Sequence, residues 1–194
     1  MENNRTIIEI QDKIKALEEK INSMEALYFK DSKNIDYSEI RLLWNKVSKL
    51  KQKILFLEGP TYSSENLDLY LDIDANLIGK ECEIFKIFLA GRKIFIGTIR
   101  VTYDNMRDNF LGNIGYELKR EYRGNGYMLE TLNILRKPLI NKGLTKPIIT
   151  TKKDNYASIK TIKNYGGVKL EDDKWYNIFE VDLGKEVDEN KKTF

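Results

Sequence analysis

The sequence predicts an α+β fold in which an antiparallel helical hairpin precedes a mixed central sheet, in the order β-β-β-β-α-β-α-β-β. Three observations predict it. Apolar residues within the first 60 positions follow a helical spacing. From residue 67 onward, apolar and polar residues alternate as they do in half-buried strands. Two later helical patterns separate strand patterns, which indicates crossovers and a parallel strand pair after an antiparallel start.

Residues 1–60 carry two helical patterns joined by a polar loop at 30–35. Asp36 is a suitable N-cap for the second helix, and Glu39 stands at the reciprocal capping position. Gly59 and Pro60 end this helix. We expect two antiparallel helices of about six turns each. Their apolar residues, here called the seam residues, are Ile7, Ile10, Ile14, Leu17, Ile21 and Met24 in the first helix and Ile40, Leu43, Val47, Leu50, Ile54 and Leu57 in the second.

The seam residues are typical of a core, so the two helices are expected to cover each other or the domain that follows. Other apolar residues give each helix a second apolar face. This second face leaves two alternatives open: the hairpin self-associates as a homodimer, or it binds a partner. The residues of the second face are Tyr28, Phe29, Leu42, Trp44, Leu55 and Phe56.

Beyond the hairpin, the pattern predicts seven strands and two helices. Pro138 is expected to kink or end the first of these helices, and Gly143 to close it. The predicted strands are 67–73, 84–89, 94–103, 113–118, 147–151, 168–170 and 175–183, and the second helix spans 155–165. The predicted organisation is therefore a hairpin at 1–60, a strand-rich domain at 61–183 and a charged tail at 184–194.

Composition excludes several chemistries. The 194 residues include no histidine and one cysteine, Cys82. This excludes Ser-His-Asp and Cys-His catalysis, histidine zinc sites and an internal disulfide, and we expect no bound metal. Lys plus Arg is 33 and Asp plus Glu is 30, so the net charge of +3 predicts no nucleic-acid partner. The sequence has neither an apolar run near ~20 residues nor a signal core, so we expect no membrane partner and a cytoplasmic protein.

A glycine-rich turn lies between a predicted strand and a predicted helix. Gly124 and Gly126 allow a sharp turn and a close approach to a ligand, and the amides that begin a helix favour an anion. Arg120 and Arg123 add positive charge beside them. The residues indicate a phosphate or pyrophosphate site, with a plain turn as the alternative.

Two common nucleotide motifs fit this turn poorly. A Walker A loop needs Gly-Lys-Ser/Thr, but Tyr127 and Met128 follow Gly126. A Rossmann fingerprint needs a third glycine, where Leu129 stands, and an early β-α-β unit.

Two separated segments resemble the GNAT superfamily of N-acetyltransferases. The run Glu121-Tyr122-Arg123-Gly124-Asn125-Gly126 is similar to the acetyl-CoA-binding motif Gln/Arg-x-x-Gly-x-Gly/Ala. Downstream, residues 148–158 look like the fifth strand of the family and the Asn-x-x-Ser/Ala start of its fourth helix, with Asn155 and Ser158 at the named positions. Residues 164–167 are similar to the end of that helix, and the resemblance covers most of 67–183.

The resemblance implies acetyl-CoA as a cosubstrate. The pantetheine arm would run between the fourth and fifth strands and pair with the backbone near Glu117 and Leu118, with Asn155 and Ser158 contacting it from the other side. The pyrophosphate would lie on the amides of Arg123, Gly124, Asn125, Gly126, Tyr127 and Met128.

The catalytic groups are less clearly indicated. Glu121 stands where the family usually has Gln or Arg, and Ile162 stands where many members have a tyrosine acid. Tyr165 could serve instead if its side chain turns toward the thiol, and a core tyrosine is the alternative. Glu117 is the candidate base, and a solvated strand residue is its alternative. The segment 74–80 is too short for the two helices that usually line the acceptor site, so the hairpin replaces them or the site is more open.

These observations predict an N-acetyltransferase that transfers an acetyl group from acetyl-CoA to a primary amine of a small molecule or a peptide by direct attack. The alternative is a non-catalytic CoA-binding or interaction module that works through the hairpin. Asp68, Asp72, Asp74 and Asp104 would favour a cationic amine such as a polyamine, and a solvated strand face explains them equally well.

Overall fold

The computed structural model describes residues 2–30, 37–77, 80–103, 112–172 and 174–185. The backbone contacts divide the chain into two units, Met1–Gly59 and Pro60–Phe194. In the part of the chain that is described, no helix is long and apolar enough to cross a membrane.

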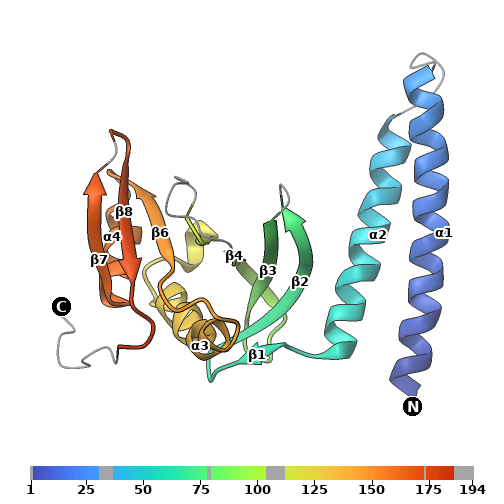
Figure 1. Ribbon diagram of the computed structural model, residues 1–194. Helices are drawn as coiled ribbons and strands as arrows, with labels where there is room; N and C mark the ends of the chain where they lie inside the picture. The colour runs from blue at the N-terminus through green and yellow to red at the C-terminus, as the bar shows by residue number, and fades with distance from the viewer. Residues whose placement is uncertain (1, 31–36, 78–79, 104–111, 173, 186–194) are drawn as a thin grey trace. The chain divides into compact units, whose positions relative to one another are not determined.

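The first unit is a pair of helices, α1 (Glu2–Lys30) and α2 (Tyr37–Glu58) (Figure 1). With 29 residues, α1 is longer than the sequence predicts. Gly59 ends α2 with a positive φ of 87°, and its N–H donates to the carbonyl of Leu55 at 3.1 Å. The predicted cap Asp36 lies outside the described residues. Glu39 forms an ion pair with Lys20 of α1 at 3.3 Å, so it joins the two helices.

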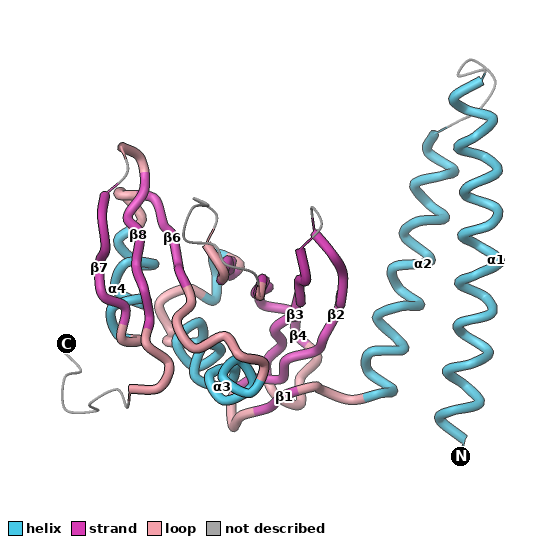
Figure 2. Tube along the Cα trace, in the orientation of Figure 1, coloured by secondary structure: helices cyan, strands magenta, loops and turns pink. Residues whose placement is uncertain are grey.

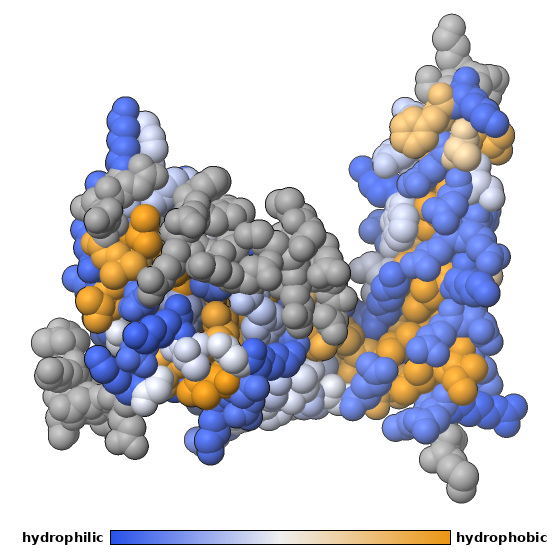
Figure 3. Space-filling view, in the orientation of Figure 1, coloured by the Kyte–Doolittle hydropathy of each residue, from blue (hydrophilic) through white to orange (hydrophobic). Residues whose placement is uncertain are grey.

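The two helices cover each other through the seam residues, as predicted. The fully buried members of the cluster include Ile21 and Ile40, and Leu17, Met24, Leu50, Ile54 and Leu57 pack around its edge. Figure 3 shows hydrophilic residues on the visible surface of this unit with apolar residues between them. Outside the seam, Phe29 and Leu42 remain 86% and 60% exposed.

In its described residues, the second unit has two antiparallel sheets together with the helices α3 and α4 (Figures 1 and 2). The first sheet has the strand order β1-β2-β3-β4-β5, and the second has the order β6-β8-β7. The elements are β1 (Tyr62–Ser63), β2 (Leu67–Leu77), β3 (Lys80–Leu89), β4 (Ile94–Thr102), β5 (Ile114–Leu118), the 3-10 turn η1 (Arg120–Tyr122), α3 (Tyr127–Asn141), β6 (Ile148–Lys152), α4 (Tyr156–Asn164), β7 (Gly167–Asp172) and β8 (Tyr176–Val181).

This architecture confirms the predicted α+β class and the order of the seven main strands. The additional strand β1 is only two residues long and pairs with Asp68 and Leu69. As expected from the short segment 74–80, β2 pairs with β3 as a hairpin. The predicted parallel pair is absent as a ladder: every pairing among the described strands is antiparallel, and the two sheets meet at the edges of β5 and β6.

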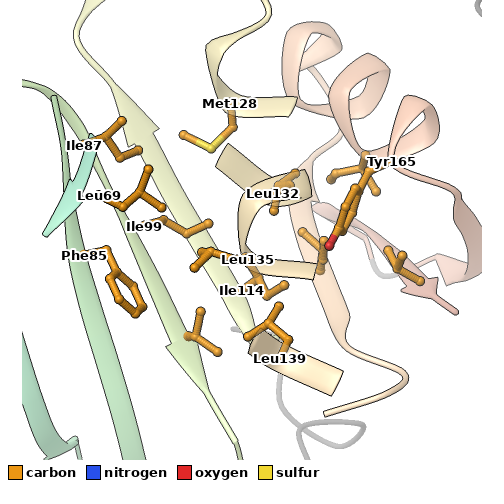
Figure 4. Packing of buried hydrophobic residues seen from close by; sticks show 14 of the residues in the cluster. Leu69, Phe85, Ile87, Ile99, Ile114, Met128, Leu132, Leu135, Leu139 and Tyr165 are labelled. Carbon is orange, nitrogen blue, oxygen red and sulfur yellow. The ribbon is translucent and has the colours of Figure 1, made fainter. Parts of the chain in front are cut away.

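Both helices pack on one face of the two sheets and enclose a single core (Figure 4). The buried face of α3 presents Met128, Leu132, Leu135 and Leu139 to the strands. Contrary to one predicted alternative, Pro138 does not end α3. It lies near the end of the helix, which continues to Asn141, and its carbonyl accepts from the N–H of Lys142 at 3.1 Å. Pro138 has no N–H to donate to the carbonyl of Ile134, so the helix loses one bond of its ladder there but still continues.

Candidate active site

The two sheets are joined by the buried side chain of Asn113, which precedes β5. The backbone N–H of Asn113 donates to the carbonyl of Ile148 at 2.7 Å, and the side-chain Oδ1 of Asn113 accepts from the N–H of Ile148 at 2.8 Å. Its Nδ2 also donates to the carbonyl of Thr102 at 2.9 Å. Gly112 comes before it with φ +64°, a conformation that glycine adopts readily. These bonds fix the first residues of β5 and β6 next to each other.

Beyond Asn113, the facing edges of β5 and β6 are unpaired. The N–H of Lys119 donates to the carbonyl of Ile96, and the N–H of Thr102 donates to the carbonyl of Asn113. The odd-numbered residues from 113 to 119 are therefore the ones whose backbone groups face β4. Because backbone groups alternate sides in an antiparallel ladder, those of Tyr116 and Leu118 point away from β4.

The same alternation applies to β6. The N–H of Val181 donates to Pro147 at 3.0 Å and that of Lys153 donates to Trp175 at 3.2 Å. The backbone groups of Thr150 therefore point away from β8, toward β5. In the described part of the chain, no ladder joins these two edges. We call this unpaired stretch between β5 and β6 the wedge, with its closed end at Asn113 and its wide end at the ends of the two strands.

At the wide end of the wedge lies the glycine loop that the sequence singles out. Gly124 and Gly126 have φ values of +81° and +78°, and no atom lies within 4 Å of where a Cβ would stand on either. Gly126 is the N-cap of α3 and contributes no side-chain cap. Among the described residues, no acceptor bonds the backbone N–H groups of residues 124–129. Consecutive free amides at a helix start form a site for an anion.

Arg123 is held at the end of β5. Its Nε donates to the carbonyl of Leu118 at 2.9 Å, and its guanidinium lies 3.8 Å from the Glu117 carboxylate. The bond to Leu118 occupies one of the backbone groups that point into the wedge. A ligand along this edge therefore finds the N–H of Leu118 but not its carbonyl.

The start of α4 forms the other wall. Asn155 caps this helix, since its Oδ1 accepts from the N–H of Ser158 at 3.2 Å. The hydroxyl of Ser158 is 2.8 Å from the hydroxyl of Tyr116 on β5. The structure thus places Ser158 beside Tyr116 of β5, two residues from Leu118, and Asn155 at the start of the same helix.

The two candidate catalytic residues lie in very different surroundings. The side chain of Glu117 is 81% exposed, on the face of β5 opposite α3 and α4. Tyr165 is 0% exposed and belongs to the core, with its ring 5.3 Å from the Arg136 guanidinium carbon (Figure 4). Burial raises the pKa of Tyr165 to about 12, and the nearby Arg136 acts in the opposite direction through its charge and as a potential hydrogen-bond donor. The two groups do not reach hydrogen-bond geometry, so the buried Tyr165 hydroxyl has no hydrogen-bond partner among the described atoms.

Replacing Tyr165 with phenylalanine tests whether its hydroxyl takes part in the reaction. We expect Tyr165→Phe to keep acetyl transfer within about twofold and to leave stability unchanged or slightly higher, because the change removes a buried hydroxyl that lacks a partner. Initial rates and urea unfolding measure both effects. A rate loss of 100-fold with unchanged stability would restore Tyr165 as a catalytic candidate.

Sequence reasoning missed Asn113 and Tyr116. The sequence offers a weak signal for Asn113, a polar residue between Gly112 and a strand, which is also ordinary turn composition. Tyr116 reads as one more aromatic residue in a strand. Only the contact with Ser158, 42 positions later, marks it.

A family model described as the acetyltransferase (GNAT) domain matches residues 36–168. Solved structures are similar at low identity. The ribosomal-protein-S5-alanine acetyltransferase from Vibrio fischeri is 20% identical over 53% of this chain and 62% of that chain, with a TM-score of 0.46. An acetyltransferase from Agrobacterium tumefaciens is 17% identical over 51% and 60%, with a TM-score of 0.43.

A GNAT-family acetyltransferase from Bacillus anthracis is 18% identical over 53% of this chain and 67% of that chain, with a TM-score of 0.45. This chain thus spans only 60% and 62% of the Agrobacterium and Vibrio chains. A search of curated protein sequences found no match. The family match covers more than half of the chain and includes the glycine loop, α3, β6 and α4. The chain therefore belongs to the GNAT acetyltransferase domain family, whose members are acyltransferases.

Proposed function

We propose that this protein transfers an acetyl group from acetyl-CoA to a primary amine by direct attack of the amine on the thioester. The observation that carries this proposal is the run of free amides at residues 124–129, which opens directly onto an unpaired wedge between two strands. The free backbone amides of the loop can bind the pyrophosphate of CoA. The unpaired strand edges can form hydrogen bonds with the amide groups of its extended pantetheine arm.

The residues present suit acetyl-CoA. The pyrophosphate would lie on the amides of residues 124–128, where Gly124 and Gly126 leave space for it. The N–H of Arg123, which the sequence also suggests, already donates to the carbonyl of Arg120 at 3.3 Å. The arm would enter the wedge and pair with the outward-pointing backbone groups of Tyr116 and with the N–H of Leu118. Asn155 uses its Oδ1 as a cap, so its Nδ2 is the group that would donate to the arm.

The proposed reaction needs little covalent help from the protein. The amine nitrogen forms a bond to the thioester carbon, the C–S bond breaks, and the nitrogen gives up a proton. A backbone N–H directed into the wedge would stabilise the negative charge that develops on the carbonyl oxygen. Glu117 is our candidate for the group that takes the proton, because its exposed carboxylate lies one residue from the wedge on a face that neither α3 nor α4 covers.

The acceptor is a primary amine of a small molecule or a peptide in this proposal. The structure weakens the case for a polycation. Asp72 is paired with Lys86 at 2.7 Å, and Asp68 accepts from the hydroxyl of Ser63 and the N–H of Gly91, both at 3.0 Å. The Asp104 position and the Asp74 side chain lie outside what is described.

We further propose that the hairpin mediates self-association. The seam residues pack between α1 and α2. A contact between two copies of the hairpin would therefore use exposed residues such as Leu42 and Phe29. Sedimentation equilibrium of the full chain tests this: a monomer at all concentrations would rule out the homodimer.

Two measurements test the proposed function. Acetyl-CoA at 100 times its Kd should stabilise the fold by about 2.7 kcal/mol, seen as a rise in Tm. Release of free CoA thiol with a panel of amines then measures transfer. No stabilisation at high acetyl-CoA would overturn the proposal, while binding without thiol release across small and peptidyl amines would favour a non-catalytic module.

A further inference from the structure

A hydrogen bond between two hydroxyl groups links the two walls of the wedge. Tyr116 on β5 and Ser158 in the first turn of α4 place their oxygens 2.8 Å apart. Both side chains are half-buried. Burial raises the pKa of Tyr116, and its bond to Ser158 opposes that rise only in part. Tyr116 therefore keeps its proton at neutral pH.

The pair lies where the reactive end of the proposed ligand would arrive. Tyr116 is two residues from Leu118 toward the closed end of the wedge, which is about 7 Å along a strand. The glycine loop lies at the other, wide end. An arm anchored on the loop amides and directed into the wedge therefore carries its sulfur toward Tyr116 and Ser158.

Each hydroxyl has a distinct capacity. A serine hydroxyl donates one hydrogen bond and accepts two, so Ser158 can accept from Tyr116 and still donate to a third atom. A chain of such bonds polarises its members and strengthens the terminal donor. Other candidates serve less well, since Tyr165 is enclosed in the core and Glu117 is an acceptor on the opposite face.

We propose that Tyr116 is a positioning residue that donates to Ser158 and thereby directs the Ser158 hydroxyl, as a hydrogen-bond donor, at the sulfur of CoA. This inference rests on the proposed function. When the C–S bond breaks, its electron pair stays on sulfur, and the Ser158 O–H stabilises that charge. Neither hydroxyl gives up its proton. Glu117, in the proposed function, takes the proton of the attacking nitrogen and passes it to solvent, and the thiolate takes a proton from solvent as CoA leaves.

The test uses CoA alone, so it needs no knowledge of the acceptor. A donor aimed at sulfur stabilises the thiolate, which lowers the pKa of the bound CoA thiol relative to that of CoA free in the same buffer. Titration of the full chain saturated with CoA, followed by the ultraviolet absorbance of the thiolate, measures this pKa. Calorimetry measures CoA affinity at a pH where the thiol is protonated.

Ser158→Ala should raise the pKa of the bound CoA thiol by about one unit. Tyr116→Phe should raise it by a smaller amount, and the double variant should match Ser158→Ala, because Tyr116 acts through Ser158. Ser158→Thr, which keeps a hydroxyl, should retain most of the effect. Tyr62→Phe is the matched control, since this half-buried tyrosine also packs on the core but lies on β1.

The outcomes separate the two proposals. An unchanged thiol pKa in Ser158→Ala and Tyr116→Phe, with CoA still bound, would overturn the positioning role and leave the proposed function intact. Additive shifts in the double variant would overturn the link between the two residues. Absence of CoA binding by the unmodified protein would overturn both.

Discussion

Replacing Gly124 with glutamate should abolish CoA binding while the protein stays folded. Gly124 begins the run of free amides, and nothing lies within 4 Å of where its Cβ would stand. A side chain there projects into the space proposed for the pyrophosphate, and its carboxylate repels the phosphate charge. We expect affinity for CoA to fall by at least ~100-fold, measured by isothermal titration calorimetry.

Gly143→Glu is the matched control for this change. Gly143 has a φ of +86°, close to the +81° of Gly124, and equally open surroundings. It follows the other end of α3, so the backbone strain is the same but the anion site is distant. CoA affinity of Gly143→Glu should equal that of the unmodified protein. Equal affinity in Gly124→Glu would show that the pyrophosphate does not lie on this loop.

Replacing Gly112 with alanine should destabilise the strand-rich unit by about 3 kcal/mol. The conformation of Gly112, with φ +64°, is strained for alanine, and a Cβ there would lie 2.7 Å from the carbonyl oxygen of Ile148. Because that oxygen is a backbone atom in β6, relief requires movement of the strand. Urea unfolding measures the loss, and CoA affinity of the folded protein should fall as well, since this contact closes the wedge.

Gly91→Ala separates the cost of the backbone conformation from the cost of the close contact with β6. Gly91 has nearly the same φ, +65°, but no atom lies within 4 Å of its Cβ position. It should lose only about 1 kcal/mol, the cost of the conformation itself, with CoA affinity unchanged. Equal losses for Gly91→Ala and Gly112→Ala would mean that the close approach of Gly112 to β6 does not hold the two sheets together.

Local sequence patterns predicted most of the elements correctly. The glycine loop is one example, because a positive φ at Gly124 and Gly126 follows from the absence of a Cβ and is a local property. The start of α4 at Asn155 is another, and the structure adds that the Asn155 side chain caps this helix by accepting from the N–H of Ser158, three residues away. The seam residues also follow from local spacing, and they pack as the heptad pattern indicates.

The surroundings of the candidate catalytic residues could not be predicted in this way. In the sequence, the strand pattern around Glu117 and the helix pattern around Tyr165 are each compatible with a catalytic residue and with a structural residue. Their exposure, 81% for the Glu117 side chain and 0% for Tyr165, depends on which face of β5 and of α4 the core covers. That choice is made by the packing of both helices on one side of the sheets.

The sequence by itself determined the helical hairpin, the order of the main strands, the glycine loop and the start of α4, because each depends on residues within a few positions of one another. Only the tertiary structure decided that the sheet divides in two, that Asn113 closes the wedge and that Tyr116 reaches Ser158. These contacts join residues 35 and 42 positions apart. Strand register and helix packing bring such residues together, and no local pattern records either one.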